Sequence, residues 1–222
     1  MRKNHLIIFF LVILAGNIIG IGLPNELLEK VTKPLLMPVL AVCFFSQTKR
    51  TGSSLKKWVL LALFFSWAGD VLLMFQDKRA IFFLLGLSSF LLAHLCYILF
   101  FHALRIREKI KGNPWLLIIV VVYYAGLIYF LSPYLADMKW PVRVYGIVIS
   151  FMFMLAMHML YLKNNTAGKW MMAGALLFVL SDSTLAINKF YQPFEGAGML
   201  IILTYGLAQL FIVNGAIKYI RN

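Results

Sequence analysis

Residues 80–102, AIFFLLGLSSFLLAHLCYILFFH, form a stretch of 23 residues without a single lysine, arginine, aspartate or glutamate. An α-helix rises about 1.5 Å per residue, so a stretch of this length spans the roughly 30 Å hydrocarbon core of a bilayer. The stretch therefore predicts a transmembrane helix, and its pattern recurs along the chain.

The whole chain has the composition of a membrane protein. Of its 222 residues, 62% are hydrophobic and 13% are charged, and the mean hydropathy is +0.86. Ordinary soluble domains are only about half apolar, which excludes a soluble globular domain. We predict an all-α, polytopic transmembrane bundle of about eight helices, forming a single integral membrane domain over residues 1–222. The expected spans are residues 6–23, 33–47, 58–75, 80–102, 115–132, 142–162, 170–187 and 197–217.

The basic residues predict the orientation of the chain in the membrane. The net charge is +13, but the 21 lysines and arginines lie almost entirely in short connections, which favours a topological role over nucleic-acid binding. With eight spans, both termini share one side with the connections after spans two, four and six. We expect that side to be cytoplasmic, in a bacterial inner membrane or, in a eukaryote, the endoplasmic reticulum. Fourteen basic residues are assigned to it: Arg2, Lys3, Lys49, Arg50, Lys56, Lys57, Arg105, Arg107, Lys109, Lys111, Lys163, Lys169, Lys218 and Arg221.

Two aspartates are the only carboxylates inside predicted spans. Asp70 and Asp182 each lie about 18 Å along their helix from its predicted cytoplasmic end, so both are expected at similar depth in the outer half of the bilayer. They are 112 residues apart, and a glycine, Gly86 or Gly198, follows each sixteen residues later. This faint pattern fits a 4+4 parallel internal repeat. Ionisable groups in a membrane interior are costly, and they usually mark a functional site.

Other polar side chains in the spans offer candidate partners for these aspartates. Lys33 either neutralises one carboxylate or extends toward lipid headgroups. Ser89, His94 and Tyr97 share one helix face with small residues, which predicts an inward orientation. Counting from the outer end puts His94 deeper than the aspartates, which favours a packing role over catalysis. No histidine spacing favours a metal site, and we expect no cofactor.

Five stretches together resemble the YhhN-like lysoplasmalogenase family: TKPLLMPVL (32–40), FSWAGDVLLM (65–74), GLSSFLLAHLCYI (86–98), GALLFVLSDSTLAINKF (174–190) and LTYGLAQLFIVNG (203–215). The resemblance implies a lipid-metabolism enzyme that takes a lysophospholipid from the bilayer. It would hydrolyse the vinyl ether bond of a lysoplasmalogen to a fatty aldehyde and glycerophosphoethanolamine or glycerophosphocholine. Asp70 and Asp182 are its expected catalytic residues. The expected substrate-binding residues are Lys33, Ser66, Ser89, His94, Tyr97, Ser181, Asn188, Tyr205 and Gln209.

Paired carboxyl groups suit vinyl ether hydrolysis on chemical grounds. One carboxyl protonates the β carbon, and a neighbouring carboxylate stabilises the resulting oxocarbenium ion and activates water, as in glycosidases. Two other interpretations stay open. Intramembrane carboxylates also serve small-solute or proton-coupled transporters. In a non-catalytic membrane scaffold the aspartates would only join helices. The oligomeric state and the order of the acid and base roles do not follow from the residues.

Overall fold

The computed structural model describes residues 3–221, which form eight α-helices. No strand occurs within this range. The predicted all-α bundle of about eight helices is therefore confirmed. The helices are α1 (Lys3–Gly22), α2 (Glu26–Thr48), α3 (Lys56–Leu73), α4 (Ile81–Arg107), α5 (Pro114–Leu131), α6 (Lys139–His158), α7 (Asn165–Ala186) and α8 (Ala197–Arg221). Four short helical turns extend or join them: η1 (Ser132–Tyr134), η2 (Ala136–Met138), η3 (Met159–Tyr161) and the π-helical η4 (Ile187–Tyr191).

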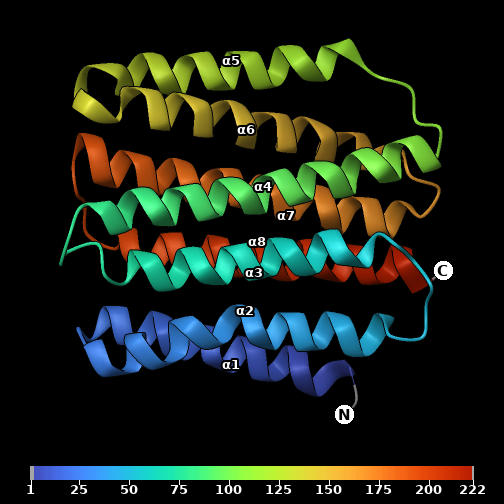
Figure 1. The fold of residues 1–222 in the computed structure, drawn as a ribbon, viewed down its shortest axis with the longest axis horizontal. Helices are drawn as coiled ribbons and strands as arrows, with labels where there is room; N and C mark the ends of the chain where they lie inside the picture. The colour runs from blue at the N-terminus through green and yellow to red at the C-terminus, as the bar shows by residue number, and fades with distance from the viewer. Residues whose placement is uncertain (1–2, 222) are drawn as a thin grey trace.

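Successive helices run antiparallel, so their connections alternate between the two ends of the bundle (Figure 1). The start of α1, the end of α8 and the connections after α2, α4 and α6 lie at one end, here called the terminal end. The connections after α1, α3, α5 and α7 lie at the opposite, distal end. This is the alternation that the sequence predicted, although Arg2, one of the basic residues assigned to the terminal end, lies outside the described residues.

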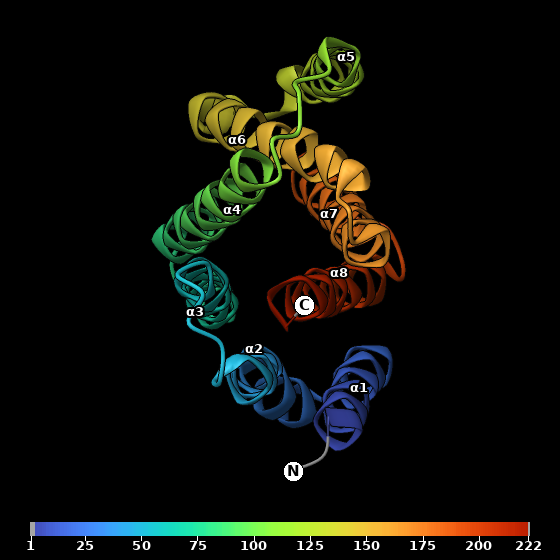
Figure 2. The ribbon, with the colours of Figure 1, turned by 90° about the vertical axis from the view of Figure 1, so that its right-hand side faces the viewer.

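Seen from the terminal end, α1 and α2 form one edge of the bundle and α5 forms the opposite edge (Figure 2). Between these edges, α3 and α4 face α7 and α8. The two aspartates come from α3 and α7 and so lie on helices from the two halves of the chain. The central helices are the ones that determine how the site is built.

Six helical segments are long and apolar enough to cross a membrane: His5–Gly22, Ile81–Arg107, Pro114–Tyr134, Ala136–Tyr161, Asn165–Tyr191 and Ala197–Arg221. The chain is a multi-pass integral membrane protein. Eight spans were expected, and α2 and α3 are not among these six. The 18 residues of α3 include Lys56, Lys57 and Asp70. Both helices pack in the same bundle, and their crossing of the membrane stays a prediction.

The second helix differs most from its predicted bounds. It was expected over residues 33–47, but α2 begins at Glu26, where the Asn25 side chain accepts a 3.1 Å hydrogen bond from the Leu28 amide. Asparagine is a favoured residue at this position because it satisfies an amide that the helix leaves without a partner. Pro34 and Pro38 lie inside the helix without ending it. As a consequence, Lys33 lies about two turns inside α2 instead of at its start.

Glycines allow the central helices to approach closely. A side chain on Gly69 of α3 would come within 2.7 Å of the Phe90 ring of α4, and one on Gly174 of α7 would come within 2.7 Å of the Ala208 carbonyl of α8. Small residues let backbones come close where helices pack in lipid. At the edge, α5 buries only Val120 and Leu131. The rest of that helix is an apolar surface suited to lipid.

Candidate active site

Asp70 and Asp182 line one cavity at the distal end of the bundle. Each lies near the end of its helix, and the cavity between them has a volume of about 330 Å³. Asp70 is 3% exposed, whereas the Asp182 side chain is 15% exposed. Carboxylates that are 112 residues apart in sequence therefore line one cavity, as a shared site requires.

The Asp70 carboxylate belongs to a buried chain of hydrogen bonds. The Tyr205 hydroxyl of α8 donates to Asp70 Oδ2 at 2.7 Å. One turn further along α8, Gln209 Nε2 donates to the Ser66 hydroxyl at 2.9 Å, and the Tyr97 hydroxyl donates to Gln209 Oε1 at 2.5 Å. Since Ser66 also interacts with the Tyr205 hydroxyl, the chain joins α3, α4 and α8. It holds the Asp70 carboxylate in one orientation.

Aromatic side chains surround Asp182. The Tyr145 hydroxyl of α6 donates to Asp182 Oδ2 at 2.5 Å. His94 Nε2 of α4 lies 3.7 Å from the same oxygen. The His94 ring is fully buried and meets the rings of Phe178 and Tyr145 edge-on, at centroid distances of 4.6 and 5.4 Å. The ring interacts with the Phe90 backbone, but neither ring nitrogen has a well-formed hydrogen bond.

His94 was expected deeper in the membrane than the aspartates, and its depth stays a prediction. Its side chain lies beside Asp182, and its enclosure among aromatic rings fits the expected packing role. Counting from the end of the span did not show that the two side chains meet. At 27 residues, α4 is about 40 Å long and exceeds the hydrocarbon core, so its end does not mark the membrane surface.

The other predicted binding residues divide into two groups. Lys33, Ser181, Asn188 and Tyr205 line the cavity with the aspartates. Ser181 also donates a 3.0 Å hydrogen bond to the Ile201 carbonyl, and Asn188 Oδ1 accepts one of 3.1 Å from the Phe194 amide. Ser181 therefore also joins α7 to α8, and Asn188 stabilises the connection between these helices.

The second group does not line the cavity, and its expected contact with substrate stays a prediction. Ser89 donates to the Phe65 carbonyl at 2.7 Å and so joins α4 to α3. The others are fully buried and contact one another or an aspartate. The group consists of Ser66, Ser89, His94, Tyr97 and Gln209.

Sequence reasoning missed three residues of the site. Tyr145 was overlooked, although its place two turns from the distal start of α6 matches the level of Asp182 near the distal end of α7. Glu29 lines the cavity but was assigned to a connection, because the second span was expected to begin later. Gln76 also lines the cavity, and its side-chain carbonyl accepts a 3.3 Å hydrogen bond from Lys189 Nζ.

A smaller hollow of about 40 Å³ is also lined by Asp182. Apart from Asp182 and Tyr145, its lining is apolar and comes from α4, α6 and the end of α7. Asp182 thus lines both the larger cavity, which contains charged side chains, and this apolar hollow. The apolar lining residues are Phe83, Leu87, Val142, Leu185, Ala186 and Phe190.

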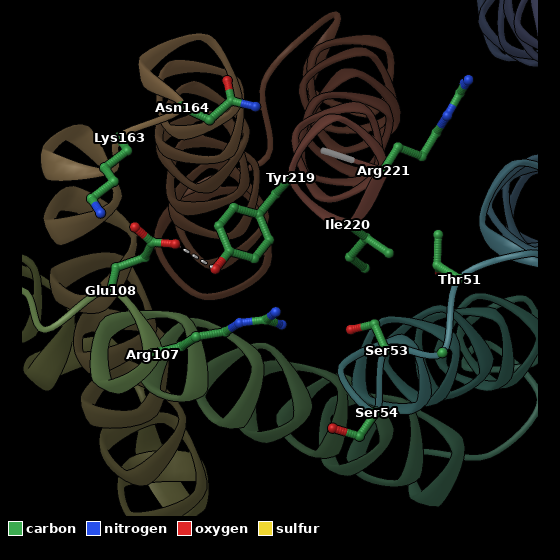
Figure 3. Close-up of a pocket in the computed structure, with 11 residues that line it drawn as sticks. Thr51, Ser53, Ser54, Arg107, Glu108, Lys163, Asn164, Tyr219, Ile220 and Arg221 are labelled. Carbon is green, nitrogen blue, oxygen red and sulfur yellow. Dashed lines mark hydrogen bonds between the residues drawn. The ribbon is translucent and has the colours of Figure 1, made fainter.

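A larger pocket of about 750 Å³ lies at the terminal end and is a poor candidate for the same chemistry (Figure 3). Tyr219 donates a 2.8 Å hydrogen bond to Glu108 there, and Arg107, Lys163 and Arg221 contribute cations. Its walls come from helix ends and connections, and neither Asp70 nor Asp182 lines it. Within residues 3–221, no group of three or more His, Cys, Asp or Glu side chains is gathered in a way that could hold a metal ion.

Comparison with known proteins assigns the chain to a family. The sequence profile of the YhhN family matches residues 28–216, which include every residue of the site described above. The chain belongs to the YhhN family. Within it, the chain is 31% identical over 180 residues to lysoplasmalogenase TMEM86B of Sus scrofa, covering 79% of this chain and 70% of that protein.

Two further relatives are also named lysoplasmalogenase. Lysoplasmalogenase TMEM86B of Homo sapiens is 30% identical over 186 residues, covering 82% of this chain and 73% of the relative. Lysoplasmalogenase of Mycobacterium tuberculosis (strain CDC 1551 / Oshkosh) is 31% identical over 163 residues, covering 72% of this chain and 60% of the relative. No solved structure matches the chain.

Proposed function

We propose that this YhhN-family protein is a lysoplasmalogenase that hydrolyses the vinyl ether bond of a lysophospholipid drawn from the bilayer. The products would be a fatty aldehyde and glycerophosphoethanolamine or glycerophosphocholine. The observation that carries the proposal is the meeting of Asp70 and Asp182 in one cavity within a membrane bundle. The names of the relatives support the choice of reaction.

The reaction needs a proton donor and a base that faces it. Transfer of a proton to the β carbon of the vinyl ether produces an oxocarbenium ion. Water adds to that ion and loses a proton, and the hemiacetal then collapses to the aldehyde and the free glycerol hydroxyl. One water is consumed and the proton is returned, so two carboxyl groups that share one proton suffice for a full cycle.

The surroundings of the two aspartates suggest which carboxyl holds the proton. Each carboxylate accepts a hydrogen bond from a tyrosine, so the difference between them is Lys33, which interacts electrostatically with Asp70. A nearby cation favours the ionised carboxylate. In the proposal, Asp70 therefore stabilises the oxocarbenium ion and accepts the proton of water, while Asp182 protonates the β carbon.

The two hollows beside Asp182 suit an amphiphilic substrate. The cavity that contains Lys33 would take the glycerol and the headgroup, and the apolar hollow would take the first part of the hydrocarbon chain. The vinyl ether joins these two parts of the molecule, which puts the reacting bond beside the Asp182 carboxyl. Removing the site from bulk water also strengthens the electrostatic interactions within it.

The orientation in the membrane forms part of the proposal. The terminal end would face the cytoplasm, since it carries most of the basic residues, and the aspartates would lie toward the opposite leaflet. The host membrane would be a bacterial inner membrane or the endoplasmic reticulum. Cysteines introduced at Ser53 and at Asp77 should react with an impermeant thiol reagent from opposite sides of sealed vesicles, and labelling of both from one side would refute the topology.

Aldehyde release by the purified protein in detergent tests the proposed reaction. The substrates are a lysoplasmalogen and its ester-linked counterpart, and the variants are Asp70→Asn, Asp182→Asn and, as a control, Asp137→Asn. Asp137 lies in η2, exposed and away from the cavity. We expect aldehyde from the vinyl ether only, with about 10²- to 10⁴-fold loss in the two site variants, as for removal of a general acid or base. No aldehyde from well-folded protein would refute the enzyme and leave solute transport as the function to test.

A further inference from the structure

The cavity holds a second pair of charged residues, and neither of them transfers a proton in the proposed reaction. Glu29 and Lys33 of α2 both line it, one helical turn apart. Both side chains are half-buried, and neither makes an ion pair with another described residue. Two opposite charges that line a cavity without pairing with each other can bind a ligand of complementary charge.

The neighbouring turn of α2 contains a second glutamate–lysine pair, which lies outside the cavity and forms an ion pair. Glu26 and Lys30 have the same order and spacing, and they close into an ion pair of 2.5 Å on the exposed side of α2. Glutamate four residues before lysine is the orientation that favours pairing on a helix. Glu29 and Lys33 therefore have the sequence arrangement of a closed pair without forming one.

The order of groups from the bundle interior outward matches that of a phospholipid headgroup. Asp70 and Asp182 lie at the reacting bond, Lys33 lies near Asp70, and Glu29 lies one turn nearer to the distal end. In an ethanolamine or choline lysolipid the same order is ether bond, phosphate and amine. Lys33 would meet the phosphate and Glu29 would meet the cationic nitrogen.

The net charge of the lining also selects among headgroups. Besides Lys33, the charged side chains of the cavity are all acidic: Glu29, Asp70 and Asp182. A headgroup that carries only negative charge would face Glu29 without compensation, which disfavours it. A zwitterionic headgroup can pair its phosphate with Lys33 and its amine with Glu29.

We propose, on the basis of the proposed function, that Glu29 and Lys33 form the headgroup subsite and that Glu29 selects a cationic amine beyond the phosphate. Glu29 is a specificity residue and takes no part in the chemical step. Its carboxylate lowers the affinity for lipids whose phosphate has no amine attached.

Binding of saturated ether lysolipids tests this subsite without any turnover. The two probes are 1-O-alkyl-glycerophosphoethanolamine and 1-O-alkyl-glycerophosphate, measured by equilibrium binding to the full chain in detergent. For Glu29→Gln we expect the first probe to bind about three- to tenfold more weakly, as for loss of a partly exposed ion pair, and the second to bind equally well or better. Glu26→Gln, the matched control, should change neither.

Two more variants make the outcome decisive. Lys33→Gln should weaken both probes, because both carry the phosphate. Glu29→Lys should reverse the preference toward the amine-free probe. Equal effects of Glu29→Gln on the two probes, or an effect of Glu26→Gln as large as that of Glu29→Gln, would overturn the subsite. Because the probes contain no vinyl ether, these results stand apart from aldehyde release, which tests the reaction itself.

Discussion

The surroundings of Asp70 and of Asp182 differ more than their similar sequence contexts suggest. Asp70 is nearly inaccessible and belongs to a polar chain that crosses three helices. Asp182 is more exposed, lines both the larger cavity and the apolar hollow, and has Tyr145 and His94 as its neighbours. The Asp70 carboxyl is thus the more enclosed of the two, and the Asp182 carboxyl is the one that both hollows share.

The origin of these neighbours is also informative. Asp70 of α3 receives its hydrogen bond from α8, whereas Asp182 of α7 is approached by α4 and α6. Each half of the chain thus contributes residues to the aspartate of the other half. The 4+4 internal repeat stays a prediction. If the two halves arose by duplication, they have diverged at the site, since the two aspartates have different partners.

The largest effect is expected from removing both aspartates together. Groups that act as one catalytic unit show losses that do not add. The double variant Asp70→Asn/Asp182→Asn should therefore release aldehyde about as slowly as the worse single variant, in assays at saturating lysoplasmalogen. If the double variant showed the product of the two single losses, the two carboxyls would act in separate steps or at separate sites.

Removing the tyrosine hydroxyls should have the next largest effect. Tyr145→Phe and Tyr205→Phe each delete one hydrogen bond to a carboxylate, so we expect about a tenfold loss in turnover from each, corresponding to roughly 1.4 kcal/mol. Tyr219→Phe is the control, because that hydroxyl bonds Glu108 at the terminal end. If Tyr145→Phe kept full activity while Tyr205→Phe did not, turnover would depend on the hydrogen bond to Asp70 and not on the one to Asp182.

The polar chain behind Asp70 should contribute to stability. Gln209→Leu leaves the buried hydroxyls of Tyr97 and Ser66 without their partner, which costs about 1–3 kcal/mol. Thermal unfolding in detergent should show a lower midpoint than for the exposed control Gln192→Leu. An unchanged unfolding midpoint would mean that these hydrogen bonds do not stabilise the part of the bundle around Asp70.

The smallest effect is expected beyond Asp182, in the connection from α7 to α8. Asn188→Ala removes the side-chain oxygen that accepts from the Phe194 amide, which should lower stability by about 0.5–1 kcal/mol in the same unfolding measurement. Activity should fall less than for Tyr145→Phe. A larger loss of activity with unchanged stability would instead assign Asn188 to substrate binding.

Much of this molecule follows from the sequence alone. Apolar stretches of spanning length predict the number of helices, and short connections make successive helices antiparallel, which puts the ends of α3 and α7 at one end of the bundle. The cost of burying charge singles out Asp70 and Asp182. The start of α2 escaped prediction because polar residues near its beginning masked the signal of a helix capped by Asn25.

The tertiary structure decided which side chains meet. In a soluble protein, apolar periodicity shows the inward face of each helix, but lipid is as apolar as a protein core, so a helix such as α5 is apolar all round and its sequence does not show which face packs inward. In α4, small and polar residues marked that face, and Ser89, His94 and Tyr97 are buried as predicted. The pairing of Tyr145 with Asp182, the place of His94 beside it, and the enclosure of Gln209 away from the cavity all depend on helix rotation and stagger. The sequence by itself determined which charged groups are buried and at which end of the bundle they lie. Only the packing of the helices brought the two carboxylates to one cavity.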